Sequence, residues 1–317
     1  MPDCSPDSVQ GLKTFFVVPD RSLFPEEFLK SFFLRGYETY FLEDDPYCSL
    51  ETKIRRLFSL FPQLILFFNI DRPIQGLEWP VFIGSLQREY GDRAMIGVMY
   101  HKRTNLEEAR KLERLYLYTI GIICGCISLE YQKSKNLYLF LNVLAANQAN
   151  GQRKYLRAMC DESYKATIQY EGVSHRVELR DLSVSHFSCV FPGETPEIPL
   201  HEKIYEIQMS LHGAILRVDG VLCLKRMLES SVIHVFVFRS REDRDGLDPE
   251  HLIRVNEIIA NEFTARMQAV LRGEFASARG KGERIDPDEA KRFIAPRTQT
   301  RARGELPDAE SILDLLR

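Results

Sequence analysis

Two short motifs in the middle of the chain carry side chains suited to binding an anionic ligand. The first is R-x-x-x-R, with Arg153 and Arg157 as its arginines and Lys154 between them. The second is D-x-S, formed by Asp181 and Ser183. A guanidinium group presents a rigid fork of N–H donors, whereas a carboxylate only accepts and a hydroxyl group does both. These side chains therefore predict a binding site, and we expect no catalytic residue among them.

R-x-x-x-R by itself is a weak signal, because the chain contains four such pairs. They are Arg110/Arg114, Arg153/Arg157, Arg176/Arg180 and Arg297/Arg301. The pair Arg153/Arg157 is distinguished by its position, since D-x-S follows about two dozen residues later with a series of short strands around it. In the alternative interpretation both arginines lie in solvent, and Asp181 and Ser183 only cap a turn.

The segment that must position these side chains reads as short strands separated by turn residues. We expect strands at 166–170, 175–182, 188–191, 204–209, 214–218, 221–224 and 232–238. Short strands with turn signals between them indicate an antiparallel barrel or sandwich. Asp248 followed by Pro249 is a good helix start, and an apolar stripe extends the expected helix to Leu271.

The two motifs, in this order and with this many strands, resemble the PilZ family over roughly residues 151 to 270. The resemblance implies cyclic di-GMP, a bacterial second messenger, as the ligand, with no cofactor or metal besides it. It also implies that Arg153, Lys154 and Arg157 wrap over the ligand while Asp181 and Ser183 bind from the opposite side. Guanine suits such a site because O6 and N7 accept from a guanidinium fork.

The chain departs from the family pattern after the serine. That pattern continues D-x-S-x-x-G, usually with a further glycine before the last one, whereas this chain reads D-L-S-V-S-H from Asp181 to His186. Glycine at such positions permits a positive φ or a close approach of the backbone to ligand. We therefore expect His186 at the ligand, where it either stacks on a guanine or crowds it.

Residues 12 to 150 alternate between apolar runs and amphipathic stripes, which indicates five strand–helix units. We expect strands at 13–18, 38–42, 64–68, 95–99 and 120–127, with helices from Pro25 to a stop at Gly36 and at 50–61, 79–90, 106–117 and 137–147. Such alternation predicts an α/β flavodoxin-like domain, a doubly wound parallel sheet with strand order 2-1-3-4-5. The layout also resembles the receiver domain of response regulators.

The residues that a receiver needs for phosphoryl transfer are incomplete. Asp20 stands alone after the first strand, and Asn69 and Asp71 straddle the end of the third. His101 and Lys102 follow the fourth strand, and no lysine follows the fifth. Because this chemistry needs carboxylates around magnesium and a cation over the transferred oxygens, we interpret the domain as a pseudo-receiver and the chain as no enzyme. An enzyme with Asp71 as phosphoacceptor is the alternative.

Composition excludes several classes of protein. The net charge of −3 with 27% charged residues argues against broad affinity for a nucleic-acid polymer. No segment approaches the roughly 18 apolar residues of a membrane span, and the first residues lack the pattern of a secretory signal. The seven cysteines are scattered, and Cys124 and Cys126 are expected on one face of a buried strand without a metal. We expect a cytoplasmic protein.

The expected organisation is a receiver-like domain at 12–150, a PilZ-like β-barrel with its C-terminal helix at 151–272, and a flexible tail at 273–317. In the tail, residues 286–293 are read as a short helix and residues 311–316 as an apolar segment that docks on a partner. The function expected from this layout couples binding of cyclic di-GMP to interactions with protein partners. The alternative is a degenerate adaptor that binds no nucleotide and serves only as an interaction scaffold.

Overall fold

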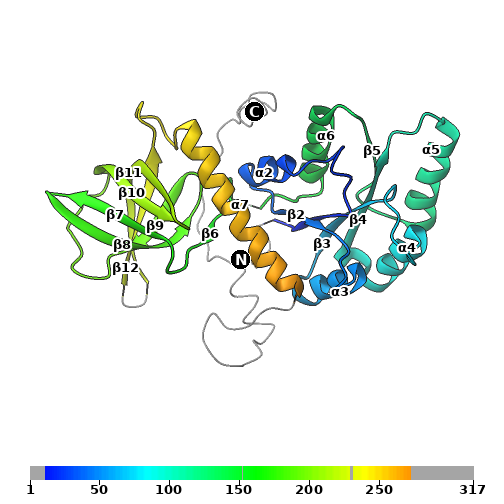
Figure 1. Ribbon diagram of the computed structural model, residues 1–317, viewed down its shortest axis with the longest axis horizontal. Helices are drawn as coiled ribbons and strands as arrows, with labels where there is room; N and C mark the ends of the chain where they lie inside the picture. Colours follow the sequence, from blue (N-terminus) through cyan, green and yellow to red (C-terminus); the bar gives the residue numbers. More distant parts are fainter. Residues whose placement is uncertain (1–10, 152, 229–230, 273–317) are drawn as a thin grey trace, which may run out of the picture. The chain divides into compact units, whose positions relative to one another are not determined.

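The computed structural model describes residues 11–151, 153–228 and 231–272 (Figure 1). The chain forms two compact units. Of the described residues, the first unit contains those up to Lys154 and Thr264–Arg272, and the second contains those within Tyr155–Phe263. This division places the first boundary four residues after the expected one and assigns the end of the last helix to the first unit. The expected tail, with its short helix and apolar segment, lies outside the described residues.

The first unit is built on a five-stranded parallel sheet with the order β2-β1-β3-β4-β5, as predicted. The strands are β1 Thr14–Val17, β2 Thr39–Leu42, β3 Leu64–Asn69, β4 Ala94–His101 and β5 Cys126–Leu129. The helices are α2 Glu27–Leu34, α3 Leu50–Leu60, α4 Trp79–Tyr90, α5 Leu106–Glu113 and α6 Lys133–Ala146, with a 3₁₀ turn, η1, at Gly91–Arg93. Helices flank the sheet on both sides (Figure 1).

Aromatic side chains fill both faces of this sheet. Successive residues of a strand point to opposite faces, and neighbouring phenylalanines of β3 follow this rule. Phe67 contacts Phe140 of α6 at 5.7 Å between ring centroids, whereas Phe68 contacts Trp79 of α4 at 5.7 Å. The continuous apolar run of β3 is therefore explained by a strand that is buried on both faces.

The fifth strand of the sheet is shorter than predicted. We expected a strand at 120–127, but its first residue, Ile120, is the last residue of a π-helix, η2, which covers Arg114–Ile120. Gly121 and Gly125 both adopt positive φ, at 81° and 82°, and the chain turns between them before β5 begins. The prediction was wrong because an apolar run does not distinguish the end of a buried helix from the start of a buried strand.

The second unit contains a closed antiparallel barrel, as expected. Its strands are β6 Ala158–Met159, β7 Lys165–Tyr170, β8 Val173–Leu182, β9 His186–Val190, β10 Lys203–Leu211, β11 Ala214–Leu228 and β12 Ser231–Arg239. The strand order is β6-β8-β7-β10-β11-β12-β9, and a pairing of β8 with β9 closes the barrel. The strands predicted at 214–218 and 221–224 are one continuous strand, β11, and the short strand β6 was not predicted.

The last helix, α7, covers Pro249–Arg272 and agrees with the expected 249–271. In the second unit its Glu262 accepts hydrogen bonds from the hydroxyl of Tyr164 at 3.3 Å and from the ring of His212 at 3.2 Å. In the first unit the carbonyl of Leu271 accepts from the guanidinium of Arg56. The helix therefore contributes residues to both units. None of the described helices combines the length and the apolar character that crossing a bilayer requires.

Candidate functional site

Asp181 lies on the outer wall of the barrel because of a β-bulge in β8. Leu179 and Leu182 are both buried, and Leu182 is opposite Phe187 of the barrel interior. The register of β8 against β9 shifts between Leu179 and Asp181, so Arg180 is the extra residue of the bulge. Without this residue, strict alternation would point Asp181 inward together with Leu179. The bulge therefore turns the carboxylate of Asp181 outward.

Arg157 reaches this carboxylate from the segment that precedes β6. Its Nη1 lies 3.9 Å from Oδ1 of Asp181, and the two side chains are 25% and 12% exposed. Burial lowers the pKa of Arg157, and the negative charge of Asp181 opposes this shift. The structure thus brings together one arginine of R-x-x-x-R and the aspartate of D-x-S.

Ser188 on β9 completes the surroundings of Asp181. Its hydroxyl donates a hydrogen bond of 2.7 Å to Oδ2 of Asp181, and the serine is 1% exposed. Among the described residues, Oδ1 of Asp181 is buried and accepts no hydrogen bond. One carboxylate oxygen is therefore oriented by Ser188, and the other has capacity for a donor. Sequence reasoning missed Ser188, although it placed this residue on the following strand.

Ser183 and His186 form the turn between β8 and β9. The amide of Ser183 donates to the carbonyl of His186 at 2.8 Å, and the amide of His186 donates to the hydroxyl of Ser183 at 3.1 Å. Ser183 is fully buried, and its hydroxyl also lies 3.0 Å from Nδ1 of His186. These hydrogen bonds give Ser183 the role within a turn that the alternative interpretation expects. A ligand contact by Ser183 or His186 stays a prediction.

The departure from the D-x-S-x-x-G pattern is compatible with this turn. None of the residues 183–186, all of which the structure describes, adopts a positive φ. A side chain is therefore tolerated at each position without backbone strain. His186 is half-buried, and its backbone amide closes the turn by donating a hydrogen bond to the hydroxyl of Ser183.

Arg153 and Lys154 belong to the first unit, whereas the other four expected site residues belong to the second. Their backbone lies against Gly36, where a Cβ atom would be 2.8 Å from the carbonyl oxygen of Lys154 and 3.2 Å from that of Arg153. Asn150 also forms an antiparallel bridge with Tyr37. The start of the motif is thus held against the first unit by its backbone.

Asp71 and Asp20, the two carboxylates considered for phosphoryl transfer, have partners within the first unit. Asp71 accepts from the backbone amide of His101 and from the guanidinium of Arg103. Asp20 lies 3.3 Å from the guanidinium of Arg72. Within the described part of the chain, no group of three or more His, Cys, Asp and Glu side chains is arranged to hold a metal ion. That the unit is a pseudo-receiver stays a prediction.

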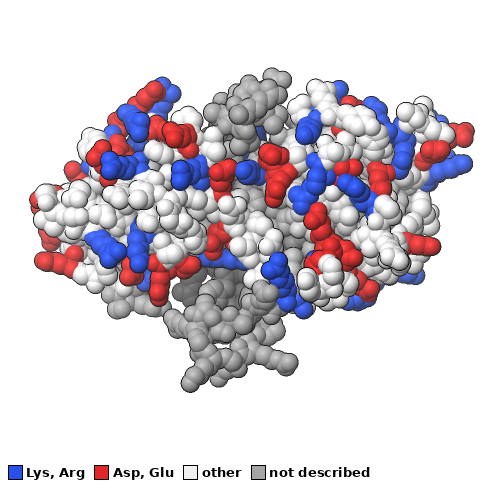
Figure 2. All heavy atoms as spheres, in the orientation of Figure 1, with Lys and Arg blue, Asp and Glu red and all other residues white. Residues whose placement is uncertain are grey.

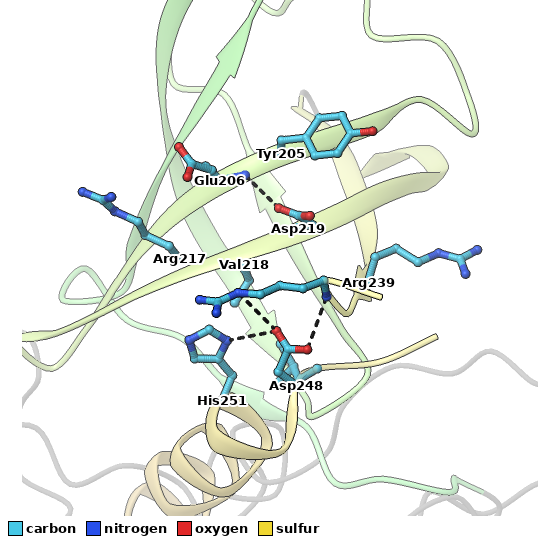
Figure 3. A pocket seen from close by; sticks show the side chains of 10 residues that line it. Tyr205, Glu206, Arg217, Val218, Asp219, Arg239, Asp248 and His251 are labelled. Atoms are coloured by element: carbon cyan, nitrogen blue, oxygen red, sulfur yellow. Dashed lines mark hydrogen bonds and ion pairs between the residues drawn. The ribbon is translucent and has the colours of Figure 1, made fainter. Parts of the chain in front are cut away.

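A cavity of about 380 Å³ opens on the second unit at the start of α7 (Figure 3). Figure 3 shows Asp248 beside His251, with 4.0 Å between Oδ2 and Nδ1, and the amide of Arg241 donates to Asp248 at 3.2 Å. On its other side Asp219 accepts from the amide of Glu206 at 2.9 Å. Because charged side chains of both signs line the cavity and pair with one another, the lining does not indicate any particular class of ligand.

The surface charge is mixed in the same way. On the face seen in Figure 2, Lys and Arg side chains alternate with Asp and Glu side chains. An extended basic face of the kind that a nucleic-acid polymer requires is not seen in this view of the described residues. Exclusion of nucleic acid stays a prediction.

No protein-family model matches the chain, and no curated protein matches it either. Solved structures do show likenesses. YcgR from Escherichia coli in complex with c-di-GMP has a TM-score of 0.32 at 18% identity, covering 38% of this chain and 50% of that one. The PilZ domain of YcgR with c-di-GMP, also from Escherichia coli, has a TM-score of 0.32 at 15% identity, covering 39% of this chain and 99% of that domain.

PlzA from Borreliella burgdorferi in complex with c-di-GMP has a TM-score of 0.24 at 17% identity, covering 42% of this chain and 48% of that one. The match thus spans about half the length of YcgR and of PlzA. Each likeness concerns part of this chain at a low TM-score, so none of them assigns a ligand to it.

Proposed function

We propose that this chain is a receptor for cyclic di-GMP that binds its ligand on the outer wall of the barrel. The observation that supports it is the pairing of Arg157 with Asp181, which brings together one residue of each motif. A guanidinium fork suits a phosphate or the O6 and N7 acceptors of guanine, and a carboxylate suits the N1–H and N2–H donors. Oδ1 of Asp181, buried and without a hydrogen bond from any described residue, has the capacity for such a donor.

The second part of the proposal is that ligand binding acts on the chain segment between the two arginines of the motif. The chain passes from the first unit to the second at Lys154–Tyr155, between Arg153 and Arg157. A ligand held by both arginines, with Lys154 adding positive charge, would restrict the backbone of this segment. Such contacts exist only in the bound state, which is what a ligand needs in order to shift an equilibrium. We propose that protein partners respond to this change.

Isothermal titration calorimetry of the full chain with cyclic di-GMP tests the proposal. We expect Arg157→Ala to weaken binding roughly tenfold or more, since hydrogen bonds to charged groups contribute on the order of 1.5–3 kcal/mol. Arg176→Ala is the matched control, because Arg176 also belongs to an R-x-x-x-R pair and is exposed on β8. No heat with the wild type, or equal affinity of Arg157→Ala and wild type, would refute the receptor function.

Hydrogen exchange of the same complex tests the coupling. Cyclic di-GMP should slow amide exchange in residues 153–157 of the wild type, because the bound arginines hold this backbone. If amide exchange in residues 153–157 is unchanged in a complex saturated with ligand, binding does not act on this segment, and the second part of the proposal is refuted.

A ligand-free adaptor is the second candidate, and the turn at Ser183 favours it. The hydroxyl of Ser183 lies within the β8–β9 turn, and Asp181 already accepts from Ser188. An adaptor predicts no thermal shift with any cyclic dinucleotide. It also predicts a complex with a protein partner that is lost when the exposed side chains of α7 are replaced.

A further inference from the structure

Arg226 on β11 lies on the same outer face of the barrel wall as Asp181. Asp181 is opposite Ser188, and Ser188 is opposite Val235. Val235 is in turn opposite Leu224 of β11. Arg226 follows Leu224 by two residues, and residues two apart on a strand share a face. The closed barrel therefore places a second arginine on the wall that carries the carboxylate.

Arg226 is also an electrostatic neighbour of Arg157. Burial is the main cause that lowers the pKa of Arg157, and the positive charge of Arg226 lowers it further. The carboxylate of Asp181, whose Oδ1 lies 3.9 Å from Nη1 of Arg157, and the side chain of Cys223 oppose this lowering. Arg157 and Arg226 repel each other, and the one carboxylate beside Arg157 leaves an excess positive charge on the pair, which an anion would neutralise.

Arg226 carries a donor that no described residue uses. Its Nε is buried, and among the described residues it has no hydrogen-bond partner. A buried donor without an acceptor is unfavourable, and more so when it belongs to a charged group. An acceptor supplied by a ligand would remove this penalty.

We propose that Arg226 is a further ligand-binding residue, which together with Arg157 binds a phosphodiester group on the outer wall of the barrel. This inference rests on the proposed function and deepens it, because it assigns a phosphate contact to a residue outside both motifs. The phosphodiester oxygens accept from the two guanidinium groups, and its charge relieves their mutual repulsion. Asp181 is then left for the guanine donors.

Titration of the full chain with cyclic di-GMP tests this role. Arg226→Ala should weaken binding about tenfold, as expected for loss of a charge-assisted hydrogen bond, and Arg226→Lys should retain part of the affinity because it keeps the charge without the fork. Lys225→Ala is the matched control, since it removes the same charge from the adjacent, exposed residue that alternation points to the opposite face. Its affinity should equal that of the wild type.

Thermal unfolding of the ligand-free variants separates binding from a structural role. Because Arg226 repels Arg157 in the free protein, Arg226→Ala should unfold at the same or a higher temperature than the wild type. Wild-type affinity in Arg226→Ala, or an equal loss in Lys225→Ala, would overturn this inference while leaving the receptor function intact. Absence of binding by the wild type would instead overturn the proposed function, and this inference with it.

Discussion

Replacing Ser188 by alanine removes the hydroxyl group that orients Asp181. The hydrogen bond from Oγ to Oδ2 is 2.7 Å long, and both residues are buried. In the variant this oxygen stays in a site that is largely closed to water. The barrel should therefore lose stability, and the carboxylate should lose the orientation that we propose for ligand binding.

The magnitude follows from the partners that remain. A hydrogen bond to a charged group contributes about 1.5–3 kcal/mol to the free energy of unfolding. The upper end applies to a carboxylate that is left with no partner, whereas here Arg157 remains 3.9 Å from Oδ1 and can approach further. We therefore expect Ser188→Ala to lower the free energy of unfolding of the barrel by about 1.5–2 kcal/mol.

Urea unfolding with two optical probes measures this change. The single tryptophan, Trp79, lies in the first unit and reports on that unit by fluorescence, whereas far-UV circular dichroism reports on both. Ser188→Ala should shift the barrel transition to lower urea, and Ser174→Ala, an exposed serine of β8, should change stability by less than about 0.5 kcal/mol. If the two variants behave alike, the hydroxyl of Ser188 does not hold Asp181, and the description of the site is wrong.

Three further predictions concern the two units separately. Gly97→Ala should destabilise the first unit by about 1–3 kcal/mol, because the added Cβ would lie 2.5 Å from Cε1 of the buried Phe67; an unchanged urea midpoint by tryptophan fluorescence would contradict this. Burial lowers the pKa of His234, so below the usual pKa of about 6.5 the folded protein binds fewer protons than the unfolded chain and its stability should fall as the pH falls. In His234→Phe the loss of melting temperature between neutral and acidic pH should be smaller, and an equal loss would show that another group is responsible. Because Asp71 is paired with Arg103, acetyl phosphate with magnesium should leave the mass of the protein unchanged, whereas an adduct that disappears in Asp71→Asn would establish the enzyme alternative.

The sequence by itself determined the architecture of the first unit. Apolar runs alternating with helical stripes are local patterns, and they predicted the order β2-β1-β3-β4-β5 that the structure confirms. The pattern did not predict the structure at 120–127, where one apolar run covers the end of a helix and the start of a strand. It also did not predict β6, which has only two residues. The strands expected at 214–218 and 221–224 are one strand, β11, because pairing with β10 and β12 keeps it continuous through Asp219 and Gly220.

The candidate site shows the same division between local and non-local information. The resemblance to the PilZ pattern selected Arg157 and Asp181, whereas side-chain type alone shows only that suitable donors and acceptors are present. Only the tertiary structure decided that a bulge at Arg180 turns Asp181 to the outer wall, and that Ser188 and Arg226 lie on the same wall. The physical reason is that neighbours across a closed barrel depend on strand register, which pairs residues far apart in the chain and leaves no periodic signal in the sequence.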